Sequence, residues 1–333
     1  MILHPGVISL LIGSLLVTIM LCYSAYEGAI IARDWDINSG SERQLGLERK
    51  TYLVSTMMTY AMGFQLLSLF LFIATTDALS HLFIGAMCAA GSLNVNAFGY
   101  PTMLLKLANF VLGGIWLIVN AADNRGYDYP LIRIKYILLI CLSPLLLTET
   151  LLQGFYLLNL SPNLITSCCS VIFAEDSRSF AAGLATLPRQ PAQLAFILSA
   201  AAVLVLGIRF LRWRKGAVLF ALAVLAFFAV SLASIVSFVS LYIYELPTHH
   251  CPFCILHAEY GYIGYPLYLT LLLGTISGTG VGALAPFGGI ASLAAILPSI
   301  QRRLTLLTLL CFLVFLLLTG ASIGLSNLDL SAY

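Results

Sequence analysis

Long apolar runs constrain this chain more than any other feature. Residues 6–32 and 304–325 each exceed the roughly 20 residues that an α-helix needs to cross the hydrocarbon core of a bilayer. The chain is 60% hydrophobic and 9% charged, which is unlike the composition of soluble domains. The sequence therefore predicts a membrane protein and excludes a soluble enzyme. A net charge of +2, carried by scattered basic residues, also excludes nucleic-acid binding.

Charged and Pro/Gly-rich breaks divide the chain into predicted membrane helices. Eight spans are expected, at residues 6–32, 52–75, 102–122, 134–159, 193–211, 216–243, 256–282 and 304–325. Two other apolar stretches, 78–98 and 283–300, are interrupted by Gly, Asn or Pro, and we expect short interfacial helices or re-entrant segments there. The first span has no basic residue before it and is too long for a signal peptide, so it should remain in the membrane. The predicted fold class is an all-α polytopic membrane protein.

The basic residues predict the orientation of these spans. Thirteen of the 16 Lys and Arg residues fall in alternate loops, which are therefore expected to face the cytoplasm. They are Arg33, Arg43, Arg49, Lys50, Arg125, Arg133, Lys135, Arg209, Arg212, Arg214, Lys215, Arg302 and Arg303. Both termini then lie outside. We expect a multi-pass protein of a prokaryotic plasma (inner) membrane, with its functional face extracytoplasmic.

A weak internal repeat suggests how the spans are grouped. The string Gly-Tyr-Pro occurs at residues 99–101 and 264–266, an offset of 165 that is close to half of the 333-residue chain. This spacing is compatible with two parallel four-helix halves, residues 1–160 and 193–333, joined by an outer loop at 161–192. Chance recurrence in a Tyr-rich chain is the competing interpretation.

The predicted topology gathers sulfur and imidazole groups on the outer face. All five histidines and five of the eight cysteines fall there: His4, His81, His249, His250, His257, Cys88, Cys168, Cys169, Cys251 and Cys254. Because that compartment is oxidising, such cysteines are expected to form disulfides, bind metal or exchange electrons. The other three, Cys22, Cys141 and Cys311, lie within apolar helices and are interpreted as small buried hydrophobes.

Residues 249–257, His-His-Cys-Pro-Phe-Cys-Ile-Leu-His, form the sharpest motif. Cys251 occupies an N-cap-like position and Pro252 the first helical turn, so the motif is expected to begin a helix. The helix dipole and a nearby imidazolium from His250 or His257 would then lower the pKa of the Cys251 thiol below its ordinary value of about 8.5. Cys251 would attack a partner disulfide, and Cys254 would resolve the mixed disulfide.

The same motif admits two other interpretations. A static structural disulfide is one, although such staples are most needed by small soluble domains. A metal site is the other, because five side chains supply soft sulfur and imidazole ligands: His249, His250, Cys251, Cys254 and His257. Covalent haem attachment is disfavoured, since Ile255 stands where that signature requires histidine.

Several residues outside the motif are candidates to support it. Cys168 and Cys169 are adjacent, so their Cα atoms are closer than a disulfide usually allows, and a bond between the two is not expected. One of them could pair with Cys88, Cys251 or an external protein, and the other could remain a free thiol. Glu259 follows Cys254 by five positions and could carry protons to the thiols.

Membrane-embedded polar residues and interfacial aromatic residues give weaker indications. Tyr262 and Tyr265 fit an aromatic belt, or a slot for a flat ring. Lys106 and Glu149 could form a pair within their spans, but we expect Lys106 to extend to the headgroups instead.

Residues 251–258, Cys-Pro-Phe-Cys-Ile-Leu-His-Ala, resemble the C-x-aromatic-C-aliphatic-x-x-Ala element of vitamin K epoxide reductase-type proteins. The bacterial disulfide-bond-forming quinone reductases carry a similar C-x-x-C. The resemblance implies a quinone-facing pair, Cys251 and Cys254, with Cys168 or Cys169 as shuttle cysteines. It covers about eight residues, and the chain departs from that family's pattern in having twice the helices and adjacent second cysteines. In the disulfide-forming branch a basic residue follows the C-x-x-C, where this chain has His257.

The leading hypothesis is a thiol-disulfide oxidoreductase that exchanges electrons between an extracytoplasmic thiol protein and a membrane quinone. In it, His250, Tyr262 and Tyr265 would contact the quinone, and Glu259 would carry protons. The alternatives are a non-catalytic subunit of a larger electron-transfer or metal-handling complex, with an outer-face metal ion or haem, and a transporter.

Overall fold

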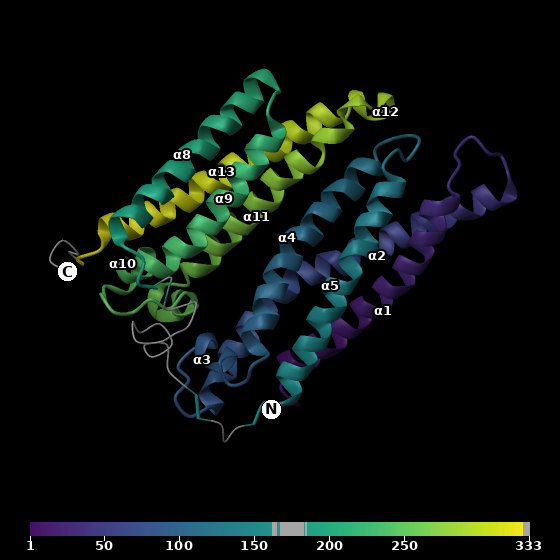
Figure 1. Ribbon diagram of the computed structural model, residues 1–333. Coiled ribbons are helices and arrows are strands. Elements are labelled where there is room, and N and C mark those ends of the chain that lie inside the picture. Colours follow the sequence, from purple (N-terminus) through teal and green to yellow (C-terminus); the bar gives the residue numbers. More distant parts are fainter. Residues whose placement is uncertain (162–164, 167–182, 184, 329–333) are drawn as a thin grey trace. The chain divides into compact units, whose positions relative to one another are not determined.

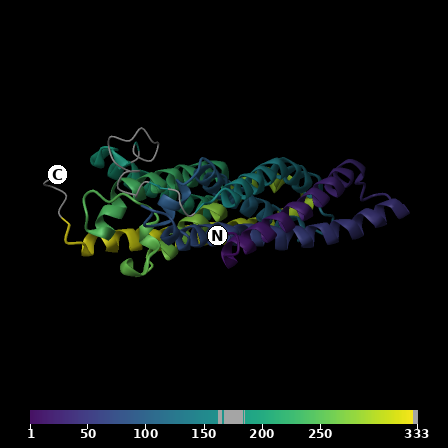
Figure 2. The same ribbon diagram turned by 90° about the horizontal axis from the view of Figure 1, so that it is seen from below.

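The structure, a computed structural model, describes residues 1–161, 165–166, 183 and 185–328. Figures 1 and 2 draw that part of the chain as coiled ribbons without arrows, and its only extended pairing is an isolated bridge between Ile84 and Ile165. Eight helices in these ranges are long and apolar enough to cross a membrane. The described residues therefore confirm the predicted helical fold, with eight helices that are long and apolar enough to span a membrane.

The long helices account for the eight spans. They are α1 (Pro5–Asp34), α2 (Glu42–Ala78), α4 (Gly99–Asp123), α5 (Ile132–Leu158), α8 (Arg189–Trp213), α9 (Ala217–Ser234), α11 (Gly264–Ala283) and α13 (Leu297–Leu325). The sixth span continues from α9 through a π-helical turn, η2 (Ile235–Val239), into α10 (Ser240–Tyr244). The remaining elements are short: η1 (Ser80–Leu82), α3 (Ala89–Leu93), η3 (Cys254–Leu256), η4 (Ala258–Tyr260), η5 (Ala285–Gly289) and α12 (Ala291–Ala294).

Two predicted helix starts lie eight or more residues from those of the structure. Helix α2 begins at Glu42, ten residues before the predicted 52, because a helix can continue beyond the hydrocarbon core where charged side chains meet water. Helix α11 begins at Gly264 and not at 256. The backbone at Gly261 and Tyr262 has φ of 62° and 55°, in the left-handed region, which a continuous right-handed helix does not allow.

The chain forms two compact units. The first comprises residues 1–75, 96–161 and 286–300, and it holds α1, most of α2, α4 and α5. The second comprises residues 76–95, 162–285 and 301–333. Residues 76–95 thus leave the helices that flank them in sequence and belong to the unit that contains the 249–257 motif.

In the first unit α5 packs against α1 and α4, and the buried contacts include charged groups. The Glu149 carboxylate accepts hydrogen bonds at 2.7 Å from Lys106 Nζ, Gln65 Nε2 and Asn109 Nδ2, so three helices converge on one anion. The side chains of Lys106 and Glu149 are only 1% and 2% exposed. The expectation that Lys106 reaches the headgroups is therefore wrong, since a buried ammonium needs a counter-charge and finds it here.

In the second unit α9 packs against α8 and α11. The α8–α9 connection is tight: Arg214 and Gly216 have φ of 53° and 87°, and at Gly216 the absence of a side chain makes that conformation accessible. Phenylalanine rings fill the core between α8, α9 and α13: Phe196, Phe227, Phe312 and Phe315. The 249–257 motif lies in the same unit, between the end of α10 and the start of α11.

Candidate functional site

Three buried cysteines form a cluster in the second unit. Cys88 Sγ lies 3.5 Å from Cys251 Sγ, and the sulfur atoms of Cys88, Cys251 and Cys254 all lie within 4.8 Å of one another. Cys88 and Cys251 are completely buried and Cys254 is 7% exposed. The 3.5 Å separation exceeds the roughly 2.05 Å of a disulfide bond, so the structure holds these two as thiols within reach of bonding.

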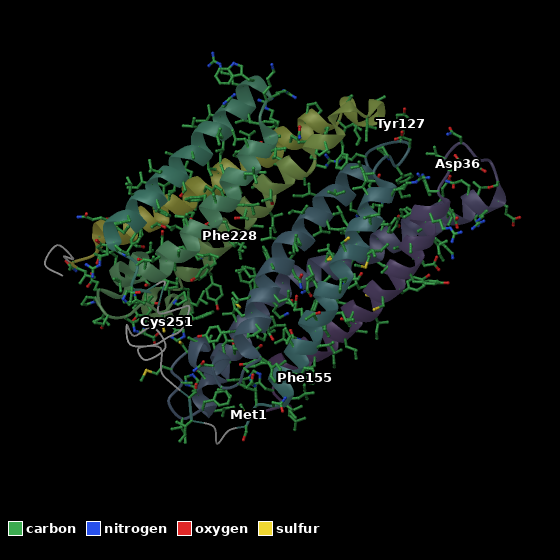
Figure 3. All side chains as sticks on the ribbon, in the orientation of Figure 1. Met1, Asp36, Tyr127, Phe155, Phe228 and Cys251 are labelled. Carbon is green, nitrogen blue, oxygen red and sulfur yellow. The ribbon has the colours of Figure 1, made fainter. Side chains whose placement is uncertain are left out.

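The motif lies on a loop. Cys251, labelled in Figure 3, is on the segment between α10 and α11, whose only helical elements are the 3₁₀ turns at Cys254–Leu256 and Ala258–Tyr260. The predicted helix start at Cys251 and Pro252 is therefore wrong, and a helix dipole cannot be the cause of a lowered Cys251 pKa. Glu245, with φ of 55°, ends α10 and turns the chain into the loop.

Side chains from neighbouring spans hold the loop by its backbone. The Tyr244 hydroxyl donates a hydrogen bond to the carbonyl oxygen of Cys251, and the Tyr268 hydroxyl donates to that of Pro252 at 2.7 Å. His250 Nδ1 lies 2.9 Å from the carbonyl oxygen of Val236, within the π-helical turn η2. A π-turn leaves carbonyl groups displaced from the regular ladder, and here one of them anchors the motif.

Asp77 joins the two segments that carry the cysteines. Its Oδ1 accepts a hydrogen bond from the backbone N–H of Ala89, the residue after Cys88, at 3.0 Å. The same oxygen lies 2.9 Å from His257 Nε2, three residues after Cys254. Because an ionised carboxylate can only accept, the imidazole nitrogen is the donor. Asp77 therefore holds the Cys88 segment against the motif loop.

Gly264 allows the loop to approach α11 closely. A Cβ atom at this position would lie 2.9 Å from the carbonyl oxygen of Ile255 and 2.8 Å from the side chain of Leu256. The contact with Ile255 is to backbone, which cannot be relieved by a rotamer change. The Gly-Tyr-Pro string that suggested a repeat thus has a packing role at its second occurrence.

Burial sets the charge of two groups beside the cluster. Partial burial lowers the pKa of His249, an effect that outweighs the opposing influence of the Cys88 thiol. Burial also raises the pKa of Tyr260, and the neighbouring Cys254 and Glu259 act in the same direction. Both shifts favour the neutral form, the uncharged imidazole of His249 and the uncharged phenol of Tyr260.

Three other predicted site residues, Glu259, Tyr262 and Tyr265, are exposed. The Glu259 side chain is 74% exposed, with Oε2 3.9 Å from His257 Nδ1. Tyr262 and Tyr265 are exposed, with ring centroids 6.1 Å apart. Cys168 and Cys169 lie outside the described residues. Thr166, just before them, donates to the carbonyl oxygen of Gly91 at 3.0 Å.

Sequence reasoning did not single out Asp77 and gave Cys88 only as one possible disulfide partner. Cys88 lies in the interrupted stretch 78–98. The break in the apolar pattern there was the available sign that this stretch does not form a full membrane span. Nothing in the sequence indicates that Asp77 meets His257, which lies 180 positions away.

Comparison with protein-family models finds no match for this chain, and neither a curated protein nor a solved structure matches it.

Substitution of Asp77 tests whether this carboxylate positions the cluster. Asp77→Ala removes the acceptor for both Ala89 and His257, so we expect the yield of a Cys88–Cys251 cross-link, formed with diamide and measured by peptide mass spectrometry, to fall several-fold. Asp77→Asn keeps an oxygen acceptor and is expected to restore most of the yield. Equal yields in wild type and Asp77→Ala would show that the hydrogen bonds do not set the sulfur geometry.

Proposed function

We propose that the protein is a membrane thiol-disulfide oxidoreductase whose redox centre consists of Cys251, Cys254 and Cys88. The observation that carries this proposal is the 3.5 Å approach of Cys88 Sγ to Cys251 Sγ, with Cys254 Sγ within 4.8 Å of both. A C-x-x-C pair with a third thiol in reach can form, break and pass on a disulfide.

The proposed reaction couples two exchanges. An extracytoplasmic dithiol reduces the Cys251–Cys254 disulfide, so that the partner gains a disulfide and the two cysteines become thiols. A lipid-soluble quinone then takes two electrons and two protons from these thiols, which re-form their disulfide as the quinone becomes a quinol. Attack by Cys88 on that disulfide would give a Cys88–Cys251 bond and a Cys254 thiol, with no net redox change.

The surrounding groups have roles in this scheme. Cys251 is the nucleophile and Cys254 resolves the mixed disulfide, as the resemblance to quinone-linked thiol oxidoreductases implies. His257, three positions after Cys254 and oriented by Asp77, is placed to exchange protons with the thiols, and exposed Glu259 exchanges protons with water. Because the thiols are buried, exchange with a protein partner requires loop 245–263 to open. The partner side is extracytoplasmic on the charge distribution of the loops.

The cycle can be tested on the purified protein. Fully reduced protein should lose two alkylatable thiols as one equivalent of a short-chain ubiquinone analogue becomes quinol, and peptide mapping should place the new disulfide among Cys88, Cys251 and Cys254. The quinone absorbance change measures the quinone reduced, and maleimide labelling measures the thiols oxidised. Quinone addition that leaves the thiol count unchanged would exclude the proposed reaction.

A further inference from the structure

The cysteine cluster has the geometry of a metal site. Three atoms that lie within 4.8 Å of one another leave a point within about 2.8 Å of each, close to the roughly 2.3 Å bond from a thiolate to a d¹⁰ metal ion. A shift of about half an ångström in each side chain would close the difference, less than a change of rotamer requires. The three sulfur atoms therefore define one coordination centre.

The chemistry of the donors selects the metal. All three are sulfur, the softest donor that a protein offers, and soft thiolates favour monovalent copper among biological metals. Their burial excludes water, which a hard cation such as Mg²⁺ would retain. We propose that Cys88, Cys251 and Cys254, in their reduced form, bind one Cu(I) ion in a three-coordinate, all-sulfur site.

Among the described residues, the ligand atoms that gather within 4.8 Å of one another come from the three cysteines, and no histidine nitrogen belongs to this group. His250 Nδ1 meets the carbonyl oxygen of Val236, and His257 Nε2 meets Asp77. Each of these contacts fixes the orientation of a ring and occupies one of its two nitrogens. Cys88, brought in from residues 76–95, supplies instead the third ligand that the sequence motif lacks.

Metal binding and disulfide formation exclude each other at this site. A bond between any two of the cysteines removes two of the three ligands, so oxidation must release the ion. Each ligand also loses a proton on binding, so affinity should weaken as the pH falls. The redox coupling rests on the proposed function, whereas the metal site itself does not.

Copper competition tests the site directly. Reduced wild-type protein, incubated without oxygen with Cu(I) held by the chromogenic chelator bicinchoninate, should remove one ion per chain, and X-ray absorption should show sulfur ligands only. Cys88→Ser and Cys254→Ser should each weaken binding by at least about 100-fold, since each removes a ligand. Cys311→Ser, a cysteine of α13 outside the cluster, should bind as wild type does. Thermal unfolding checks that each variant is folded.

Three results would overturn the proposal. They are absence of stoichiometric copper, nitrogen ligands in the absorption spectrum, and loss of binding in a Cys168→Ser/Cys169→Ser variant with full binding in folded Cys88→Ser. The quinone assay separates this inference from the proposed function. If the protein binds copper but quinone does not oxidise it, the metal site stands and the oxidoreductase assignment fails. If quinone oxidises the protein but it binds no copper, the oxidoreductase assignment stands and the metal site fails.

Discussion

Cys251→Ser is expected to abolish quinone-linked thiol oxidation, lowering the rate by at least about 100-fold, because a hydroxyl cannot replace a thiol as nucleophile or as disulfide partner. Cys251 is the cysteine that the others surround: Cys88 Sγ lies 3.5 Å away, and Cys254 is its partner in the C-x-x-C. Stopped assays of quinol formation with a dithiol donor measure the rate.

The matched control for this prediction is Cys311→Ser. Cys311 is also buried, but it lies within α13 and outside the sulfur cluster. It should retain the wild-type rate and the wild-type unfolding temperature. If folded Cys251→Ser keeps the wild-type rate, Cys251 is not the nucleophile, and the redox centre must be sought elsewhere in the chain.

Glu149→Gln is expected to cost about 3–5 kcal/mol of stability, the usual effect of removing one partner from a buried ion pair. The Lys106 ammonium would stay buried without its counter-charge, and the anion on which α2, α4 and α5 converge would be gone. Unfolding of the purified protein in mixed micelles, followed by circular dichroism, measures the loss.

Two further variants separate charge from packing. Glu27→Gln breaks the Glu27–Lys50 pair, in which the lysine is 49% exposed, and should have a much smaller effect because water can solvate what is left. Lys106→Met/Glu149→Gln removes both charges and should be more stable than Glu149→Gln alone. A Glu149→Gln protein as stable as wild type would contradict the role assigned to the pair.

Apolar patterning was sufficient to predict the eight spans, because a helix that crosses a bilayer must be apolar over a nearly fixed length. The ends of the helices were less predictable. At α11 the boundary depends on positive φ angles at Gly261 and Tyr262, and the hydrophobicity of residues 256–263 gives no indication of them. At α2 the helix extends into polar sequence that patterning assigns to a loop.

The sequence also predicted part of the candidate site, the C-x-x-C pair, but not the residues that pack against it. The spacing of Cys251 and Cys254 indicates thiol or metal chemistry on chemical grounds alone. Cys88 and Asp77 come close to that pair only through long-range contacts: Cys88 contacts Cys251, 163 positions away, and Asp77 contacts His257, 180 positions away. His250 and His257 also contact Val236 and Asp77, and their spacing in the motif does not reveal these contacts.

The sequence by itself determined the apolar character of this protein, the number of its helices that are long and apolar enough to span a membrane, and the C-x-x-C spacing of Cys251 and Cys254. These follow from local properties: hydrophobicity over about 20 residues, and two thiols three positions apart. Only the tertiary structure decided that a third sulfur completes the cluster, that a loop rather than a helix start presents it, and that Lys106 is buried against Glu149. Each of these depends on the packing of segments distant in sequence, because a buried polar group is stabilised by partners that composition cannot identify.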